Sequence, residues 1–335
     1  MKLSRLGEFG LIERVRRATP KSRGVLLGIG DDAAWVANKT GSCLITGDIL
    51  IEGVHFNLKW TSLFDLGYKT LAVNLSDIAA MGGIPAYLIL SIGVPPNFDS
   101  ADIDEFYRGI KSLAEKSGVA LVGGDTSVAA GLFISACLIG HAPFRPVTRG
   151  GAKQGDDIYV TGTLGDSALA LSLLQKTAKQ TARGPVKYLL SRHHRPTPRL
   201  TAGAVLARER LATAMIDVSD GLVQDLGHIC KASSVGALVW ENKLPLSRAY
   251  RIIAASDDTR PALSGGEDYE LLFCARERDR SRIEKLPQQV GVEITRIGTC
   301  VPRRRGIIVL DHSDKPRAVR SQGHDHFKGN NLGSR

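Results

Sequence analysis

The chain has 335 residues, of which 43% are hydrophobic and 23% are charged, with a formal net charge of +10. This length predicts two domains, each large enough to bury its own core. No apolar run approaches the roughly 20 residues of a membrane span, and the five cysteines lack the Cys-x-x-Cys spacing of zinc sites. The composition argues against a membrane protein and a disulfide framework. The N-terminus lacks a secretory apolar region, so we expect a cytoplasmic protein.

The positive charge is unevenly distributed. Residues 1–140 contain 13 Lys and Arg against 14 Asp and Glu, whereas the remainder contains 31 against 20. A basic second half suits either nucleic acid or anionic small substrates. Basic residues are not interleaved with aromatic ones as in RNA-binding modules, and runs such as 303–305 are typical of a solvated surface. We therefore expect a small anionic substrate and no nucleic-acid partner.

The first half alternates predicted helices and strands. Its clearest helix spans about residues 65–81 and is followed by Gly82-Gly83. Asp77 lies away from the apolar stripe of this helix and near its C-terminal end, where the helix dipole disfavours an anion and favours a counter-cation. The other elements expected here are a helix at 9–17, strands at 25–29, 43–45 and 86–94, a helix from 99 to 118, and strands at 119–122 and 132–141.

A polar, glycine-rich stretch at 149–156 marks the expected domain boundary, which gives domains at 1–148 and 149–335. Strands and helices alternate on both sides of it, so the fold class is α/β or α+β in two lobes. The elements expected in the second half are a strand at 157–161, a helix at 168–174, a surface excursion at 175–198, a helix at 200–208, a strand ending at Asp217, a helix from Leu222, a strand at 271–275, and one more helix and two strands within 276–310.

Acidic residues recur in predicted turns at the ends of these elements. The first group, Gly28-Ile-Gly-Asp-Asp32, partly fits the dinucleotide fingerprint, but adjacent carboxylates would repel an anionic ligand unless a cation lay between them. An Asp-rich turn can also simply cap a loop. The complete set is more informative, and it comprises Asp31 and Asp32, Asp48, Asp77, Asp125, Asp217 and Asp220, and Glu267.

Many carboxylates without a cluster of His or Cys favour several Mg²⁺ ions and a polyphosphate substrate over zinc chemistry. Glycosidase chemistry would need only one carboxylate pair. The chain has neither a Walker A motif nor the protein-kinase motifs, so an ATP enzyme would belong to neither class. A lone His such as His55 is more often structural than a ligand, but its closeness to Asp48 favours a binding role.

Five motifs follow one another along the chain: Gly28-Ile-Gly-Asp-Asp32, Asn74-Leu-Ser-Asp77-Ile-Ala-Ala-Met-Gly82, Gly123-Gly-Asp-Thr126, Asp217-Val-Ser-Asp-Gly-Leu222 and Ser264-Gly-Gly-Glu-Asp-Tyr-Glu270. In this order they resemble the thiamine-monophosphate kinase family of the aminoimidazole-ribonucleotide synthetase superfamily. The resemblance covers nearly the whole chain. It implies a two-domain subunit, a homodimer paired through the N-terminal domains, and phosphoryl transfer from ATP to thiamine monophosphate, which yields thiamine diphosphate and ADP.

The resemblance also implies roles for individual residues. The implied magnesium ligands are Asp32, Thr46, Asp48, Asp77, Asp125, Asp217 and Asp220. The implied ATP site comprises Tyr107, Gly124, Asp125, Arg149 and Ser219. The implied thiamine-phosphate site comprises His55, Glu267 and Phe327, the last as an aromatic wall. Catalysis is expected to depend on Asp77, Asp125, Arg149 and Asp220.

One position departs from the family pattern: Gly47 stands where the family usually has a hydroxyl residue, so water or a backbone carbonyl would replace that contact to magnesium. The acceptor phosphate is already ionised, so we expect direct in-line transfer without a phosphoenzyme.

Three alternatives remain open: a superfamily member with another acceptor, a module that binds ATP without transferring phosphate, and a basic nucleic-acid-binding protein.

Overall fold

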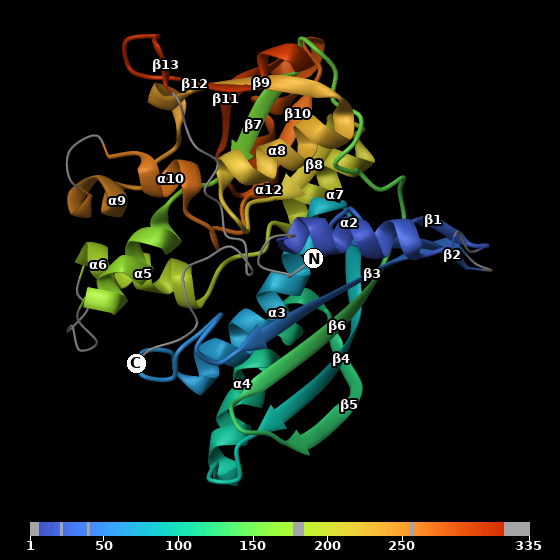
Figure 1. Cartoon of the computed structure of the whole chain (residues 1–335), viewed down its shortest axis with the longest axis vertical. Coiled ribbons are helices and arrows are strands. Elements are labelled where there is room, and N and C mark those ends of the chain that lie inside the picture. The colour runs from blue at the N-terminus through green and yellow to red at the C-terminus, as the bar shows by residue number, and fades with distance from the viewer. Residues whose placement is uncertain (1–6, 21–22, 39–40, 177–183, 255–257, 318–335) are drawn as a thin grey trace.

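In the computed structural model, residues 7–20, 23–38, 41–176, 184–254 and 258–317 are described, and they form two mixed α/β units stacked along the long axis of the molecule (Figure 1). The expected fold class is confirmed. Within these residues, no helix has both the length and the apolar character needed to cross a membrane.

The first unit is built on a six-stranded sheet. Its strand order is β1 (Val25–Leu27), β2 (Ala34–Asn38), β3 (Gly41–Ile51), β6 (Phe133–His141), β4 (Ile84–Val94) and β5 (Ala120–Val128). All neighbouring pairs are antiparallel except β4 and β5. Side chains on one face of the central strands form a single apolar core with the two long helices α3 (Leu63–Ala80) and α4 (Ser100–Ser117).

The two long helices pack directly on each other, and α4 is amphipathic whereas most of α3 is buried. Ser62 caps α3 by accepting the Asp65 N–H, and α4 ends at Gly118, whose φ of 69° few side chains tolerate. At their crossing, a Cβ on Gly67 would lie 1.9 Å from the carbonyl oxygen of Phe106, and one on Gly109 would lie 2.0 Å from that of Phe64. The helices can therefore approach this closely only because both positions lack a side chain.

The second unit is built on a seven-stranded sheet. Its strand order is β13 (Pro316–Arg317), β12 (Ile307–Leu310), β9 (Val235–Trp240), β11 (Ile294–Pro302), β7 (Asp157–Thr161), β10 (Leu271–Ala275) and β8 (Ala212–Asp217). Both faces of this sheet are covered, because α8 (Leu222–Ser233) packs on one apolar core and α7 (Leu200–Arg208) on another. The remaining helices are α2 (Glu8–Ala18), α5 (Asp166–Lys176), α6 (Gly184–His194), α9 (Arg248–Ile253), α10 (Arg260–Ser264), α11 (Arg280–Ile283) and α12 (Leu286–Val290).

Helix α3 also joins the two units. Its last turn packs on α7, where a Cβ on Gly203 would lie 2.0 Å from the carbonyl oxygen of Ala79. Ser76, on the same end of α3, donates a hydrogen bond to Asp217 at the end of β8. The expected helix over 65–81 is therefore confirmed, and its C-terminal half lies at the junction between the two sheets.

Two of the predicted turns are wrong. Asp48 and Asp125 lie inside the long strands β3 and β5 rather than after short ones. The adjacent glycines suggest turns, but they lie against neighbouring strands. A Cβ at Gly47 would be 3.1 Å from a backbone oxygen of β6, and one at Gly124 would be 1.7 Å from a backbone oxygen of β4. These glycines allow close contact with the next strand and do not reverse the chain.

We expect Gly67→Ala to lower the free energy of unfolding by about 1–3 kcal/mol or more, because the new methyl group overpacks the helix crossing. The matched control is Gly227→Ala in α8, where the nearest atom to the new Cβ, on Ile307, is 3.7 Å away. That change should be neutral or stabilise by up to about 1 kcal/mol, since alanine is the better helix former. Chemical denaturation of both variants measures the difference, and equal effects would contradict the packing argument.

Candidate active site

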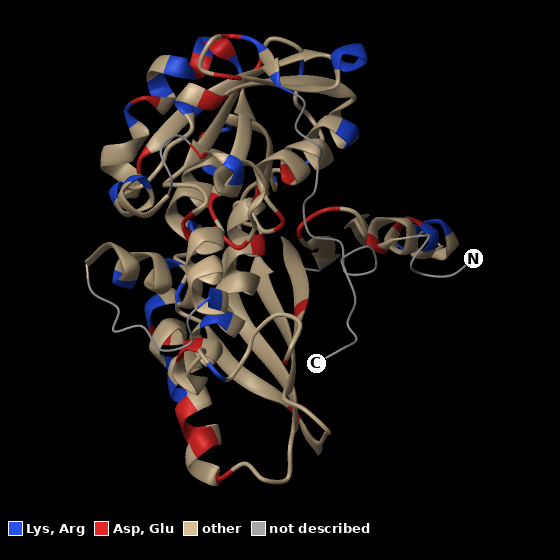
Figure 2. Cartoon of the chain, turned by 60° about the vertical axis from the view of Figure 1, so that its left-hand side comes forward, with Lys and Arg blue, Asp and Glu red and all other residues tan. Residues whose placement is uncertain are grey.

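Three carboxylates from different elements converge at the junction of the two units. Asp32 precedes β2, Asp77 lies in the last turn of α3, and Asp217 ends β8. One oxygen atom of each lies within 4.8 Å of the others. Figure 2 shows acidic residues on the loops at this junction. The three groups come together only because α3 spans both units.

Neighbouring side chains fix the orientation of each carboxylate. Thr46 on β3 donates to Asp77 with an Oγ1–Oδ2 distance of 2.5 Å, and Ser76 donates to Asp217 with an Oγ–Oδ2 distance of 2.7 Å. The Arg149 guanidinium donates to Oδ1 of Asp32 at 2.5 Å.

The electrostatics of this cluster are unfavourable without a ligand. Burial, together with the nearby carboxylates, raises the pKa of Asp77 well above its usual range. Burial raises the pKa of Asp217 to about 8 and that of Asp48 to about 6. The second oxygen of Asp32, Oδ2, is buried and has no hydrogen-bond partner among the described residues. These groups would gain most from a shared cation.

The chemistry of this donor set fits Mg²⁺. The converging atoms are carboxylate oxygens, which are hard ligands that Mg²⁺ prefers. The orphaned oxygen of Asp32 provides an acceptor that no protein donor satisfies. Magnesium also usually retains waters and substrate phosphates as ligands, so a few carboxylates at the edge of a cavity suffice.

The loop after β8 is held by a residue that the motif analysis missed. Oδ2 of Asp225 accepts the backbone N–H groups of Ser219, Asp220 and Gly221 at 3.0–3.1 Å. Asp225 is buried in the first turn of α8, where a carboxylate is favoured by the helix dipole. Its position in the first turn of the predicted helix could have indicated this role.

The turn before β10 adopts a strained backbone. Glu267 has a φ of 66° and Tyr269 a φ of 51°, which is unusual for residues other than glycine. Two backbone bonds to the loop after β8 hold the turn, with the Glu267 N–H donating to Ser219 and the Tyr269 N–H donating to Val218. Such strain persists where surrounding contacts fix it and is often found at functional sites.

The Glu267 side chain has a buried cationic partner. Nζ of Lys69, on α3, lies 2.7 Å from its Oε1, and the Lys69 side chain is only 3% exposed. Burial opposes the charge of Glu267, but the Lys69 ammonium holds its pKa below the usual value. The sequence analysis missed Lys69, although a lone lysine in an apolar helix pattern is a signal for a buried ion pair.

A single large cavity of about 1620 Å³ joins these groups. Ten of the residues that the family resemblance gives a role line it: Asp32, Thr46, Asp48, His55, Asp77, Arg149, Asp217, Ser219, Asp220 and Glu267. The cavity extends to Phe9 on α2, whose ring packs on His228 with 4.7 Å between centroids. The strands and loops thus place distant motifs around one space.

Three of the expected ATP-site residues do not line this cavity. Tyr107 lies on α4, where it packs edge-on against Phe106, and Gly124 and Asp125 lie on the edge strand β5. Asp125 pairs in register with Ser91, and side chains at paired positions point to the same face of a sheet. That face is opposite the one covered by α3. Phe327 lies outside the described residues.

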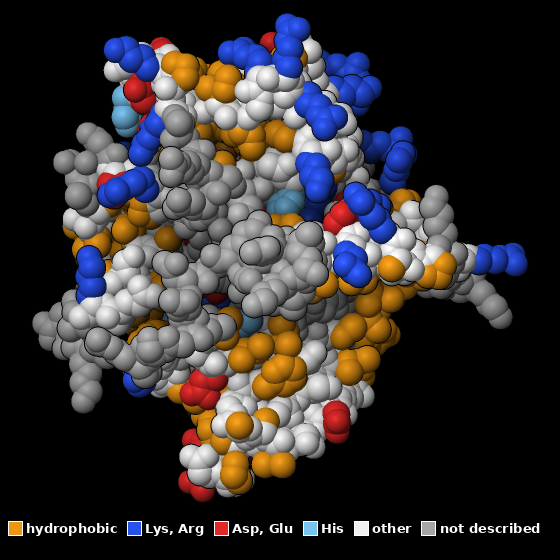
Figure 3. Space-filling view, in the orientation of Figure 1, with side chains coloured by type: hydrophobic (Ala, Val, Ile, Leu, Met, Phe, Trp, Pro, Cys, Tyr) orange, Lys and Arg blue, Asp and Glu red, His pale blue; other side chains and the backbone are white. Residues whose placement is uncertain are grey.

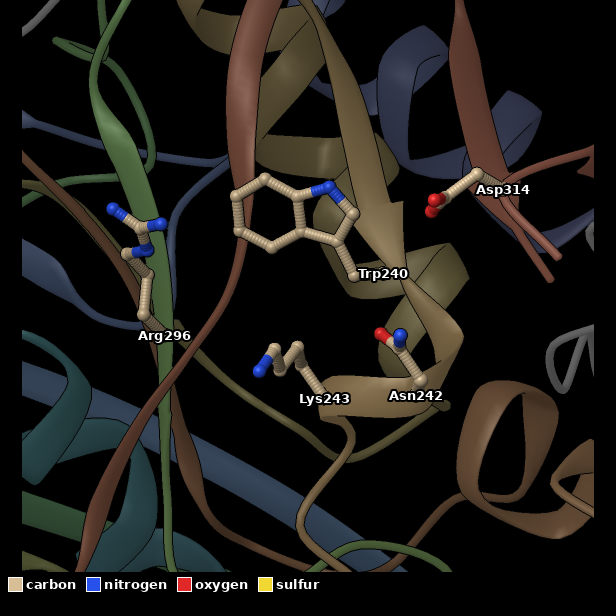
Figure 4. Close-up of a pocket in the computed structure, with 5 residues that line it drawn as sticks. All are labelled: Trp240, Asn242, Lys243, Arg296 and Asp314. Carbon is tan, nitrogen blue, oxygen red and sulfur yellow. The ribbon is translucent and has the colours of Figure 1, made fainter. Parts of the chain in front are cut away.

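A second, smaller pocket lies in the C-terminal unit (Figure 4). Its volume is about 210 Å³, and it is lined by Trp240, Asn242, Lys243, Arg296 and Asp314. The Arg296 guanidinium lies 5.1 Å from the centre of the Trp240 ring. None of the motif carboxylates is present, so this pocket cannot supply the chemistry that the large cavity offers.

Comparison with known proteins matches both units to known domains. Residues 30–142 match the N-terminal domain and residues 153–311 the C-terminal domain of AIR synthase related proteins. A curated relative from Escherichia coli (strain K12), named thiamine-monophosphate kinase, is 42% identical over 96% of this chain and 98% of its own length. The two matched domains place the chain in the class of AIR synthase related proteins.

Solved structures show the same likeness. A structure titled as AaThiL complexed with AMPPCP and TMP has a TM-score of 0.85 and 34% identity, covering 97% of this chain and 99% of its own. A thiamine-monophosphate kinase structure from Stenotrophomonas maltophilia K279a has a TM-score of 0.76 and 41% identity, covering 90% and 96%. The chain therefore belongs to the thiamine-monophosphate kinase family.

Proposed function

We propose that this protein transfers the γ-phosphoryl group of ATP to the phosphate of thiamine monophosphate and releases ADP and thiamine diphosphate. The observation that carries the proposal is the convergence of Asp32, Asp77 and Asp217 at the wall of a cavity that also holds Arg149 and Glu267. At one end, such a cavity offers cation-binding oxygens and an arginine that can bind polyphosphate. At the other end, Glu267 offers a separate polar group that can bind the acceptor.

Magnesium would be held by Asp32, Asp77 and Asp217, with Asp48 beside them, and would supply the positive charge that lets two polyanions approach. The Arg149 guanidinium lines the cavity and can bind the donor phosphates. The attacking oxygen belongs to an ionised phosphate and needs no general base. The protein therefore acts by positioning and charge neutralisation, as phosphoryl transfer mostly requires.

The remaining roles expected from the sequence complete the proposal. Thr46, Asp48, Asp125 and Asp220 are further magnesium ligands, and Asp77, Asp125, Arg149 and Asp220 act in catalysis. ATP is bound by Tyr107, Gly124, Asp125, Arg149 and Ser219, and thiamine monophosphate by His55, Glu267 and Phe327. Residues 1–148 form the ATP- and magnesium-binding domain and residues 149–335 complete the site. We place the enzyme in the cytoplasm.

We also propose that the enzyme is a homodimer paired through the first sheet. The face of this sheet opposite α3 is exposed and apolar, with Ile49 45%, Tyr87 46% and Ile89 39% exposed. All nine residues of the edge strand β5 are exposed. Figure 3 shows hydrophobic side chains gathered over this part of the molecule. An apolar face next to an unpaired edge strand is typical of an association surface.

The dimer would also explain the position of Asp125. Within one chain this side chain points to the face opposite the carboxylate cluster, and two strands separate β5 from β3. Because neighbouring strands are about 4.8 Å apart, β5 lies about 14 Å from β3. Asp125 therefore reaches an active site most directly from a second copy of the chain.

The first experiment measures ADP formation from ATP and Mg²⁺ with and without thiamine monophosphate, with chromatography for thiamine diphosphate. We expect thiamine diphosphate only when all three components are present. ATP binding without acceptor-dependent product would contradict the proposed acceptor, and turnover with another acceptor would indicate a different member of the class.

We expect Asp77→Asn to lower turnover at saturating Mg²⁺ by at least about 100-fold, the scale of losing one electrostatic stabiliser in an active site. Asp65→Asn, at the other end of the same helix, is the control and should retain nearly full turnover. Steady-state kinetics and thermal melting of both variants separate loss of chemistry from loss of folding. Near-wild-type turnover of Asp77→Asn would refute its role.

We expect Ile89→Lys to convert the dimer to monomer, because it buries a charge in the proposed interface. Ile252→Lys, at a 56% exposed position in α9, is the matched control and should leave the mass unchanged. Light scattering coupled to gel filtration measures both. A dimeric mass for Ile89→Lys, or a monomeric wild type, would overturn this part of the proposal.

A further inference from the structure

A second charged cluster lies in the cavity wall around Glu267. Its Oε1 pairs with Lys69 of α3, and its Oε2 lies 3.4 Å from Nδ1 of His193 at the end of α6. The same Nδ1 is 2.9 Å from Oγ of Ser167 on α5. Residues of α3 and α6 thus contact one carboxylate, and Ser167 of α5 contacts it only through His193. Only one of these four side chains has so far been given a function.

The arrangement cancels the charge of Glu267 without removing its hydrogen-bonding capacity. Lys69 is 3% exposed and does not line the cavity, whereas Glu267 does and is 27% exposed. Burial lowers the pKa of His193 to about 3, so its ring is neutral. The ion pair is therefore neutral overall, and the group exposed to the cavity is an oriented carboxylate that can accept hydrogen bonds.

Helix α3 sets the distance between this cluster and the carboxylate triad. Three residues spaced four apart lie on one side of this helix: Lys69, Val73 and Asp77. The last two of them line the cavity. Eight residues of α-helix span about 12 Å. An acceptor with its phosphate near Asp77 would extend past the apolar Val73 and place its far end at Glu267.

The far end of thiamine monophosphate carries its only N–H donors, on the exocyclic amine of the pyrimidine ring. We infer that Lys69 and His193 are positioning residues that hold the Glu267 carboxylate to accept a hydrogen bond from this amine, and so determine specificity for the acceptor. The inference rests on the proposed function and extends it, because it assigns Glu267 a hydrogen-bonding role rather than attraction of the cationic thiazolium ring.

The test compares thiamine monophosphate with the analogue in which oxygen replaces the pyrimidine amine. Wild type should prefer the amine by at least about tenfold in kcat/KM, the scale of one hydrogen bond to a charged group. Lys69→Met should reduce this preference to about threefold or less. It should also raise KM for thiamine monophosphate at least about fivefold, while KM for ATP and kcat stay within about twofold.

The control is Arg195→Met. It removes the ion pair between Arg195, which follows α6, and Asp65 on α3, away from the cavity. This variant loosens contact between the same parts of the chain and should keep the wild-type preference for the amine.

Should Lys69→Met not fold, the pair His193→Leu and His193→Asn tests the same point. The asparagine amide nitrogen can occupy the place of Nδ1, so His193→Asn should retain the preference that His193→Leu loses.

Each outcome distinguishes the two proposals. An unchanged preference in Lys69→Met and His193→Leu, or no preference in wild type, overturns the inference while leaving the kinase intact. Tighter binding of thiamine monophosphate by Lys69→Met would also overturn it, because a carboxylate freed of its lysine would then attract the thiazolium ring. Failure of wild type to phosphorylate thiamine monophosphate would instead reject the proposed function.

Discussion

The structure depends on bringing three carboxylates within 4.8 Å of one another in a largely buried place. Their mutual repulsion and desolvation oppose folding, so they converge only because rigid elements hold them there. Asp77 is held by the last turn of α3, and Asp217 by the end of β8. The close packing of α3 on α4 and on α7, through positions that lack side chains, provides this rigidity.

Helix α3 therefore does more than fill the core of the first unit. Its capped N-terminal end packs on α4, its middle carries Lys69 and Val73, and its last turn carries Ser76 and Asp77. One rigid helix thus relates the carboxylate cluster at one end of the cavity to Glu267 at the other. A loop could not hold that spacing, because loops tolerate changes in length and conformation that a packed helix does not.

The sequence predicted those parts of the site that depend on local pattern. The helix over 65–81 follows from its apolar spacing and its glycine stop, and its acidic residue was recognised as unusual for a helix end. Thr46 and Asp48 were assigned to a turn because Gly47 resembles a chain reversal. The strand continues there because β6 lies against Gly47, and this contact is not visible in local sequence. The ion-pair partner of Lys69 and the hydrogen-bond donors to Asp225 likewise could not be predicted, because they are brought together only by the fold.

The hydrogen-bond partners of the other buried acids indicate that the three converging carboxylates are arranged to bind a ligand. Glu270, fully buried, pairs with Arg192 and Arg199. Asp225 accepts three backbone N–H groups, and Asp268 accepts those of Gly165 and Ser167. Within the described part of the chain, each of these acids is thus satisfied by the protein itself.

In the cluster, by contrast, Asp32 keeps a buried oxygen with no donor, although Arg149 satisfies its other oxygen. Asp77 receives a single hydroxyl from Thr46 and faces three other carboxylates that raise its pKa. A fold that supplies donors to Glu270, Asp225 and Asp268 could have supplied them here with one more Arg or Lys. Leaving this charge uncompensated is costly for stability, and it is the property that binding a cation and its phosphates requires.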